Sequence, residues 1–537
     1  MINMDALYEA IALVFTWHTL MWIAIGVTIG VGVGAMPGLT ATTGIALMLP
    51  LTFTMDQAAA LGLLIGLYKG AIYGGSISAI SFATPGTSEA AATVFDGHKL
   101  MTRGKGKKAL LIALYASVTA DFLSDVITIM IAPMLALVAL KFGPSERFWL
   151  MVLAVCLLGA LSGSHFAKGM LSAAMGLFIG TIGADPVSSV PRNTFDLWWL
   201  GEGIHLIPLV VGIFAMGAML EKIVEMSTVK QKVQRLGGTV KGLFSMGGEG
   251  LSLKEYLSCW KEMSIGLGVG TFVGMLPGLG STVGAFLSYG IAKQASPEKK
   301  IGTGKIEGVA AAEAGNNATV GPTLVPLLAF GIPGSAVAAL IGAALMLQGA
   351  TPGPRMFELF PTVIYSLFLI LILGNFFNLG IGRVFAFVYA KLGELPPQVL
   401  VPIVMGMAVI GAYSYANNEW DVLVMLVFGI IGLFMRTFRI PEAPLIITFL
   451  LAPQAEENLR RGLLINEGDW VATLMNSPLA IGLAIAVVAL TYISTRMRIS
   501  ERMTEIADDA EAAERKPKPK RPLNRLNLIE TTAGKDQ

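Results

Sequence analysis

The stretch Gly30-Val-Gly-Val-Gly-Ala-Met-Pro-Gly-Leu-Thr-Ala-Thr-Thr-Gly44 carries the most information on the fold, because a close copy of it recurs 240 residues later. The copy reads Gly270-Thr-Phe-Val-Gly-Met-Leu-Pro-Gly-Leu-Gly-Ser-Thr-Val-Gly284, and eight of the fifteen positions are identical. A second pair follows in the same order, Phe82-Ala-Thr-Pro-Gly-Thr-Ser88 and Phe330-Gly-Ile-Pro-Gly-Ser-Ala336. Two motifs that recur in the same order indicate a duplicated unit.

The chain around these motifs is strongly apolar. Of its 537 residues 54% are hydrophobic and only 14% are charged, and the mean hydropathy is +0.69. Ordinary soluble domains carry about 25% charged residues. The net charge of +2 indicates no nucleic acid or other acidic partner. The sequence therefore predicts an all-α polytopic protein that lies in a lipid bilayer.

The apolar stretches set the expected number of spans. Residues 10–55 contain no Asp, Glu, Lys or Arg, which leaves room for two passes, or for one pass and a broken helix. Counted in this way, the chain holds about 12 transmembrane helices. We expect a first membrane repeat over 1–220, a connector over 221–262, a second membrane repeat over 263–495 and a flexible tail over 496–537.

The basic loops predict the orientation in the membrane. Lys and Arg gather in residues 98–108, in the connector and in 293–305, which the positive-inside rule places in the cytoplasm together with the C-terminal tail. The acidic-leaning segments are then periplasmic; these are 1–10, 185–203, 414–421 and 453–470. The first ten residues have no Lys or Arg, so we expect a retained first span rather than a cleaved signal peptide.

The charges also indicate how the two repeats are related. The first repeat is entered from the acidic N-terminus, whereas the second is entered from the basic connector. The loop after the first repeat's second motif is basic (98–108), but residues 348–358 in the second repeat contain only Arg355 and Glu358 as charged residues. Equivalent loops therefore fall on opposite sides, which predicts two inverted-topology repeats with broken or re-entrant helices, as in many secondary transporters.

Each Pro-Gly pair is expected to break a helix within the membrane. Proline removes a backbone donor, and the freed backbone groups are tolerated only beside protein, ligand, ion or water. Helix N-termini at the breaks favour a carboxylate, and loop carbonyls favour a cation. The breaks, with the hydroxyl and amide residues near them, form the predicted substrate site: Pro37, Gly38, Thr40, Thr42, Thr43, Pro85, Gly86, Thr87, Ser88, Pro277, Gly278, Ser281, Thr282, Asn316, Asn317, Pro333, Gly334 and Ser335.

Other interpretations of the same residues remain open. Gly-rich runs such as 26–34 also serve close helix packing, and a single Pro-Gly pair often does no more than kink a helix. Asp121 and Asp125 share one helical face, so they are either an intramembrane functional pair or water-exposed residues between two short spans. Cys156, Cys259 and the four histidines show no disulfide or metal-ligand spacing.

Several longer motifs are distinctive, among them Gly34-Ala-Met-Pro-Gly-Leu-Thr, Tyr73-Gly-Gly-Ser-Ile-Ser-Ala, Glu313-Ala-Gly-Asn-Asn-Ala and Gly349-Ala-Thr-Pro-Gly-Pro. With these motifs, about residues 15–495 resemble the large membrane subunit of bacterial tripartite tricarboxylate transporters. The resemblance implies three components: this chain, a small four-helix membrane subunit, and a periplasmic solute-binding protein that delivers a carboxylate substrate. It also implies the bacterial inner membrane and uptake driven by a Na⁺ or H⁺ gradient.

The residues agree with an ion-driven mechanism and suggest where a cation binds. No Gly-x4-Gly-Lys-[Ser/Thr] loop is present, so the chain is not expected to hydrolyse ATP. The four motifs contain no Lys or Arg, so a co-bound cation would help to hold a carboxylate; Na⁺ near Gly38, Gly278, Asn316 and Asn317 is a candidate. No other metal or cofactor is expected.

Three rival functions stay open at this point. An intramembrane enzyme would use Asp121 with Asp125, or Glu313, as acid and base, but the polar groups near the breaks are mostly hydroxyls and amides, which suit binding better. A passive channel and a scaffold for a delivery receptor are the other two. We favour a secondary transporter subunit with alternating access at a midplane site, and no enzymatic activity.

Overall fold

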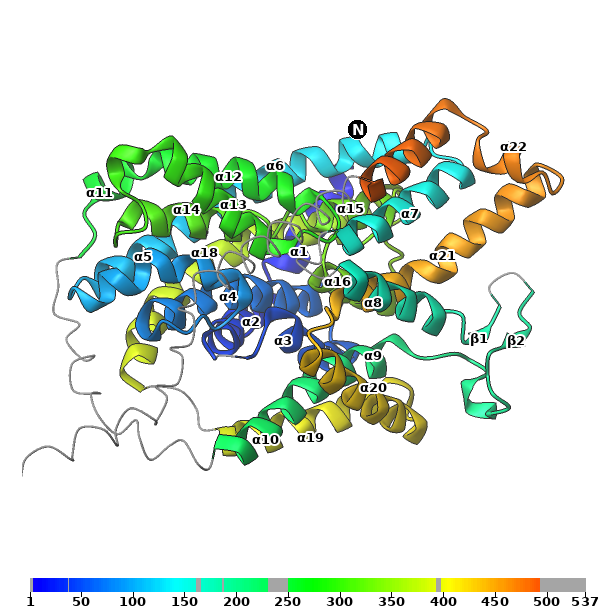
Figure 1. The fold of residues 1–537 in the computed structure, drawn as a ribbon, viewed down its shortest axis with the longest axis horizontal. Coiled ribbons are helices and arrows are strands. Elements are labelled where there is room, and N and C mark those ends of the chain that lie inside the picture. Colours follow the sequence, from blue (N-terminus) through cyan, green and yellow to red (C-terminus); the bar gives the residue numbers. More distant parts are fainter. Residues whose placement is uncertain are drawn as a thin grey trace, which may run out of the picture. The chain divides into compact units, whose positions relative to one another are not determined.

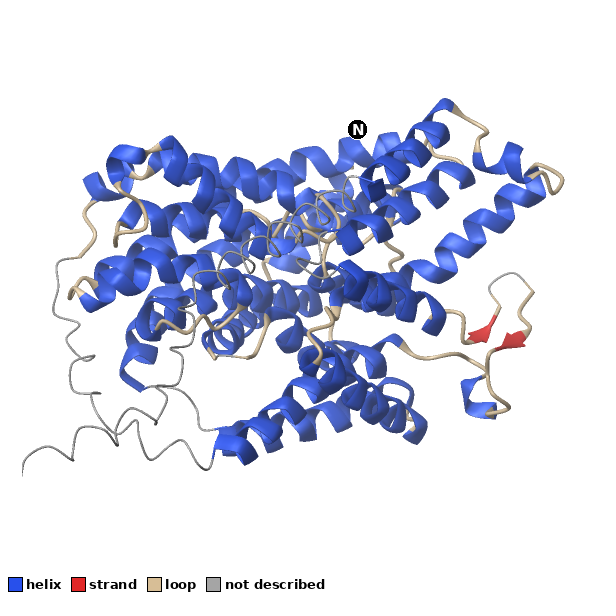
Figure 2. Cartoon of the chain, in the orientation of Figure 1, coloured by secondary structure: helices blue, strands red, loops and turns tan. Residues whose placement is uncertain are grey.

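The computed structural model describes residues 3–36, 38–160, 166–185, 188–229, 250–392 and 397–492. The predicted site residue Pro37, residues 230–249 of the connector and the C-terminal tail lie outside this range. The chain divides into two units, Met1–Val487 and Val488–Gln537. In the described residues it is built from helices, with one short antiparallel hairpin of β1 (Gly183–Ala184) and β2 (Pro191–Arg192) (Figure 2).

The helices of the first half are interrupted near both of its Pro-Gly motifs. They are α1 (Met4–Val14), α2 (Trp17–Ala35), α3 (Ala41–Met48), α4 (Gln57–Phe82), the 3-10 turn η2 (Ser88–Ala90), α5 (Ala91–Thr102), α6 (Gly106–Ala139), α7 (Pro144–Ala160), α8 (Phe166–Ile179), α9 (Leu206–Val210), a π-helical segment (Val211–Met216) and α10 (Gly217–Val229). Within residues 10–55, the long α2 follows the end of α1 and is followed by the short α3 and a 3-10 helix (Leu49–Thr54), which fits the broken-helix alternative.

The helices of the second half repeat this order from α12 onwards. They are α11 (Leu253–Ser258), α12 (Trp260–Met275), α13 (Gly280–Ala295), α14 (Ile306–Asn317), α15 (Leu324–Phe330), α16 (Ala336–Leu347), α17 (Met356–Leu359), α18 (Pro361–Leu392), α19 (Pro397–Ala416), α20 (Glu419–Thr437), α21 (Ala443–Ile465) and α22 (Trp470–Leu474). Helices α12 and α13 correspond to α2 and α3, whereas α14 and α15 together take the place of the continuous α4.

Packing between the halves is reciprocal. In Figure 1, α4 of the first half lies beside α18 of the second, and these two helices are in contact. The equivalent helix of the second half, α14, packs against α6 of the first half. Each half therefore packs a helix that follows its first break against a long helix of the other half.

The glycine-rich run in α2 is a packing surface. A Cβ on Gly30 would lie 2.3 Å from the carbonyl oxygen of Leu67 in α4, and one on Gly70 would lie 2.4 Å from the carbonyl oxygen of Val27 in α2. The two backbones approach so closely that side chains are excluded on both sides. The packing interpretation of residues 26–34 therefore holds for this run, while the Pro-Gly pair that follows it interrupts the helix.

In the described part of the chain, six helices are long and apolar enough to cross a membrane: Trp17–Ala35, Gln57–Phe82, Gly106–Ala139, Leu206–Met226, Pro361–Phe385 and Glu419–Thr437. Five shorter apolar helices accompany them among the described residues: Ala41–Thr54, Ala167–Ile179, Ala336–Leu347, Val401–Ala416 and Pro478–Tyr492. The chain is thus an all-α protein with several membrane-spanning helices. The total of about 12 spans and the inverted sense of the repeats stay predictions.

Segments that were predicted to share one side of the membrane contact one another. Arg103 donates to the carbonyl oxygen of Thr303 at 2.6 Å, and Lys108 donates to Glu255 at 2.6 Å, which joins the three basic segments. The acidic-leaning segments also meet, because Arg192 binds Glu456 in α21 through both carboxylate oxygens. Basic segments therefore cluster with basic ones and acidic-leaning segments with acidic-leaning ones.

Candidate functional site

The first half contains two helix interruptions that approach each other. Between α2 and α3, Gly38 has a φ of +85°, a conformation that favours glycine. After α4, Ala83 caps the helix with a φ of 57°, and residues 84–87 lead into η2. A Cβ on Gly86 would lie 2.0 Å from the carbonyl oxygen of Gly34, so the second interruption packs directly on the end of α2.

The second half has two interruptions at the equivalent places. Gly278, between α12 and α13, has a φ of +89°, and Gly331, after α15, has a φ of +75°. The amide of Gly278 donates to the carbonyl oxygen of Gly334 at 2.9 Å. Pro333 and Gly334 are buried, and Pro277 is half-buried. The backbone groups freed by one break thus bind those freed by the other.

The four interruptions come together across the halves. Helix α3, after the first break, packs against α16, after the last. Likewise α13, after the third break, packs against η2, after the second. Thr282 donates to Ser88 at 3.3 Å, although Ser88 itself is exposed. The structure therefore brings together segments that are far apart in the sequence.

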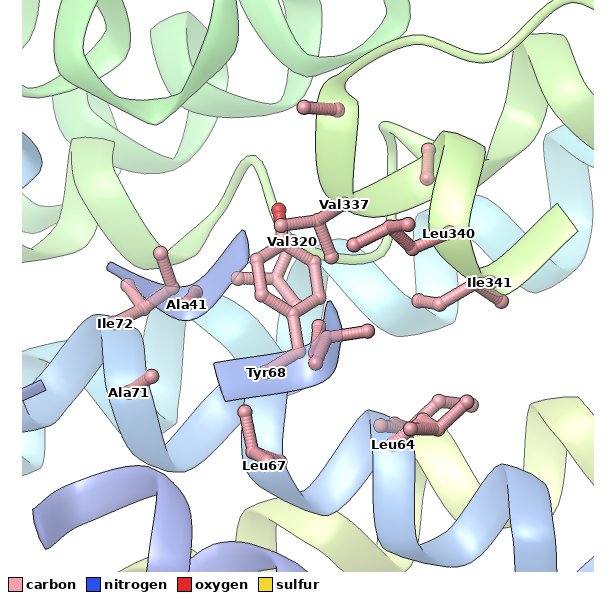
Figure 3. Packing of buried hydrophobic residues seen from close by; sticks show 14 of the residues in the cluster. Ala41, Leu64, Leu67, Tyr68, Ala71, Ile72, Val320, Val337, Leu340 and Ile341 are labelled. Carbon is pink, nitrogen blue, oxygen red and sulfur yellow. The ribbon is translucent and has the colours of Figure 1, made fainter. Parts of the chain in front are cut away.

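Tyr68 of α4 lies at the centre of this arrangement. Figure 3 shows its ring between Ala41 at the start of α3, Val320 and Val337 at the start of α16. Its hydroxyl interacts with the side chains of Ser281 and Thr323. A buried tyrosine that carries a polar group into the meeting point of three interrupted helices could contact a bound substrate. Sequence reasoning did not single out Tyr68.

The predicted hydroxyl residues fall into two groups. Thr40 and Ser335 are N-caps: Thr40 accepts from the Thr43 amide at 3.2 Å, and Ser335 accepts from the Ala338 amide at 3.1 Å. These hydroxyls stabilise the starts of α3 and α16. The others line the junction: Ser281 shares a 2.5 Å hydrogen bond with Thr319, Thr87 is buried without a hydrogen bond from its hydroxyl, and Thr42 is half-buried on α3.

Asn316 and Asn317 end α14 in the buried interior, next to Glu313. Glu313 is fully buried and accepts hydrogen bonds from Ser76 at 2.5 Å, Ser117 at 2.9 Å, Thr93 and Asn317. Both polar atoms of the Asn316 side chain, and the Asn317 oxygen, are buried without a hydrogen-bond partner. Such unsatisfied oxygens around a carboxylate are the ligands that Na⁺ prefers. A proton on Glu313 would neutralise the buried carboxylate equally well.

A buried ionic cluster lies on α4 and α6. The Lys69 ammonium is 2.8 Å from both Asp121 and Asp125, and the Asn375 amide donates to Asp125 at 2.6 Å. Lys69 and Asp125 are 0% exposed, and Asp121 is 1% exposed. Of the two alternatives for the aspartates, the water-exposed one is therefore wrong. Two carboxylates and one ammonium sum to −1, which leaves one negative charge for a proton or a cation to balance.

Sequence reasoning missed two lysines at this site. Lys69 is a single lysine inside an otherwise apolar span of the sequence, and that was itself the signal, because such residues are rare and functional. Lys222 of α10 lies over the first break, where its Cε is 3.3 Å from the position of a Cβ on Gly38. The Pro-Gly motifs contain no cation, but the folded site has two nearby.

The groups at this site that could bind a cation are oxygen atoms. Among the residues that the structure describes, no three His, Cys, Asp or Glu side chains are grouped to hold a metal ion. Of the positions predicted for Na⁺, Gly38 and Gly278 offer only backbone at breaks, whereas Asn316 and Asn317 adjoin the Glu313 carboxylate. Asn316 and Asn317 are therefore the better supported of the predicted Na⁺ positions, and Na⁺ binding there stays a prediction.

Comparison with known proteins agrees with the resemblance seen in the motifs. A family model described as "Tripartite tricarboxylate transporter TctA family" matches residues 20–447. A relative from Agrobacterium vitis, named "Uncharacterized 52.8 kDa protein in TAR-I ttuC' 3'region", is 35% identical over 88% of this chain and 93% of its own length. A second protein from that organism, "Uncharacterized protein in TAR-II ttuC' 3'region", is 36% identical over 41% of this chain and 93% of its own. No solved structure matches.

Proposed function

The chain belongs to the tripartite tricarboxylate transporter TctA family, and on this premise we propose that it imports a di- or tricarboxylate by alternating access, driven by a Na⁺ or H⁺ gradient. It is a membrane subunit of a transporter family. A periplasmic solute-binding protein would deliver the substrate, and a small four-helix membrane subunit would complete the complex in the bacterial inner membrane. The N-terminus would be periplasmic and the C-terminus cytoplasmic.

The convergence of the four helix breaks, with Tyr68 buried where three of the interrupted helices meet (Figure 3), carries this proposal. The breaks come from two repeats of the same element order, and each break packs against one from the other repeat. In inverted-repeat transporters the substrate site lies at such a junction, near the middle of the membrane. The starts of α3, α13 and α16 offer helix N-termini, which favour a carboxylate.

The buried carboxylates support coupling to a cation gradient. The Lys69 cluster has a net charge of −1, and Glu313 is held by hydroxyl and amide groups without a cation beside it. Burying an uncompensated charge is costly, so uptake of a proton or Na⁺ stabilises the site. Residues 318–323, which follow Asn317, join these clusters to the breaks, because Gly321 lies against Asp125, Thr319 bonds to Ser281 and Thr323 lies against Gly334. Cation binding would therefore affect the segments that hold the substrate.

The enzyme alternative has less support. Asp121 and Asp125 share one lysine, so neither is a free acid or base. Glu313 accepts four hydrogen bonds in a fully buried position. A channel would not need two buried ionisable clusters beside interrupted helices, whereas a coupled transporter does.

The test is uptake of labelled citrate, succinate and benzoate into proteoliposomes without ATP. The vesicles contain this chain and the small subunit, with the binding protein outside and an imposed Na⁺ or H⁺ gradient. We expect gradient-dependent accumulation of one carboxylate class. In Glu313→Gln we expect exchange to continue while accumulation is lost, whereas Thr437→Ala, which removes an exposed hydroxyl that bonds within α20, keeps both. Accumulation that persists after both gradients are collapsed would refute ion coupling.

A further inference from the structure

A pocket of about 320 Å³ lies beside the last helix break. It is lined by Arg147 of α7, by Phe330 and Ile332 on either side of Gly331, and by Glu457, Asn458 and Arg461 of α21. Small-molecule sites commonly have volumes of about 300–1,000 Å³, so the pocket is large enough for a small organic acid. It lies outside the junction around Tyr68.

The charge around this pocket is unbalanced. Arg461 is paired with Glu457 in the same helix, and Glu146 accepts from Ser477. Within the described ranges neither Arg147 nor the nearby Arg355 has an ion pair with a carboxylate. Burial, with the positive charges of Arg355 and Arg461, lowers the pKa of Arg147. The guanidinium groups repel one another, and an anion between them would relieve that repulsion.

Two structural connections lead from the pocket to the interior site. The first is the backbone: Ile332 in the pocket wall is followed by Pro333 and by Gly334, whose carbonyl accepts from Gly278. The second is α7, which carries Arg147 near its start and Leu158 near its end, against Gly278. At 1.5 Å per residue the two α7 positions are roughly 16 Å apart along the helix. An anion in the pocket would therefore lie beside the last break, and α7 would link it to the third break at Gly278.

We propose that this pocket receives the carboxylate substrate before it reaches the interior site. Arg147 binds one carboxylate group through its planar pair of N–H donors, and Asn458 and Arg461 contact the rest of the molecule. The pocket wall includes α21 residues from the segment predicted to be periplasmic, where the binding protein releases its cargo. This assignment rests on the transport function proposed above.

The pocket is tested by protection of an engineered cysteine. Asn458→Cys places a thiol in the wall, and a membrane-impermeant methanethiosulfonate is applied to the complete transporter in nanodiscs of phosphatidylcholine. The unmodified chain, in which Cys156 is half-buried and Cys259 buried, gives the background labelling. We expect citrate, succinate or benzoate to slow modification at least threefold, and Arg147→Gln to remove this protection.

Kinetic variants provide a second readout. Arg147→Gln should raise the KM for uptake about tenfold or more, with a smaller change in kcat, because the interior site is untouched. Arg355 is exposed, so Arg355→Gln should raise the KM for uptake less than Arg147→Gln does and should disturb the fold less. Lys141→Gln is the matched control, since it removes an exposed cation close to the pocket but outside its lining.

Each outcome separates the pocket from the transport function. Absence of protection by all three carboxylates overturns the pocket, whether or not uptake occurs. Protection that appears only when phosphatidylglycerol replaces phosphatidylcholine assigns the arginines to lipid headgroups and also overturns it. Protection by a carboxylate with no uptake of any compound supports the pocket and contradicts the transport proposal.

Discussion

The backbone amide of Gly278 donates to the carbonyl oxygen of Gly334 at 2.9 Å, which ties the third helix break to the fourth. The two residues are 56 positions apart, and each follows a proline. The hydrogen bond satisfies two polar groups that the prolines would otherwise leave unpaired in an apolar interior. The breaks are thus stabilised by each other, which makes their geometry sensitive to either residue.

We expect Gly278→Ala to destabilise the protein and to abolish uptake. A Cβ there would lie 2.7 Å from a Leu158 side-chain carbon, and the φ of +89° is strained for any L-residue, at about 1–2 kcal/mol. Thermal unfolding in detergent and proteoliposome uptake measure the two effects. Gly290→Ala in α13, where a Cβ meets open space, is the control and should be neutral or stabilising. Equal melting temperatures and uptake in both variants would contradict the close packing of this break.

We expect Lys69→Met to be among the most destabilising single substitutions in the chain. It leaves Asp121 and Asp125 buried without their counter-charge, and breaking a buried pair typically costs about 3–5 kcal/mol. The triple variant with Asp121→Asn and Asp125→Asn should recover much of the loss. Unfolding followed by tryptophan fluorescence measures this, with Lys141→Met, an exposed lysine just after α6, as control. If Lys69→Met alone has the same free energy of unfolding as the parent, Lys69 does not neutralise the two buried aspartates.

A disulfide between η2 and α13 should lock the transporter. The hydroxyls of Ser88 and Thr282 are 3.3 Å apart, so cysteines at both positions can pair when oxidised. Alternating access requires interrupted segments of the two repeats to move relative to one another. We expect crosslinking to stop uptake and dithiothreitol to restore it, while each single cysteine variant stays active under oxidation. Full uptake in the crosslinked protein would show that these two segments move as one body.

Acid should weaken the contact between α6 and α11. The hydrogen bond from Lys108, with further ones from Ser252, lowers the pKa of Glu255 from 4.5 to about 2. A lowered carboxyl pKa means that the stabilisation is fully present above pH 4.5 and is lost as the pH falls through about 2. The stability difference between the parent and Glu255→Gln should therefore be constant from pH 7 to 5 and shrink from pH 4.5 towards 2.

Melting curves over this pH series provide the measurement. Glu298→Gln, which removes an exposed carboxylate without a hydrogen bond among the described residues, is the control and should show no such trend. If the stability difference between the parent and Glu255→Gln instead grows as the pH falls below 4.5, the contact between Lys108 and Glu255 does not stabilise the protein in the way proposed.

The sequence alone determined that this is a helical membrane protein with a repeated, interrupted element. Composition, apolar lengths and the Pro-Gly pairs are local properties, and local properties fix where a helix can run and where it must break. The motifs were also sufficient to indicate the family, because they are long and recur at equivalent positions.

The tertiary structure alone decided which polar groups share a site. Lys69 meets Asp125 across 56 residues and Asn375 across 306, and no periodicity in the chain links them. Likewise helical spacing could not decide whether Asp121 is exposed, because the burial of Asp121 depends on how α4 packs against α6. Helix breaks are set by backbone chemistry along the chain, whereas charge pairing is set by which helices lie side by side, and only packing determines that.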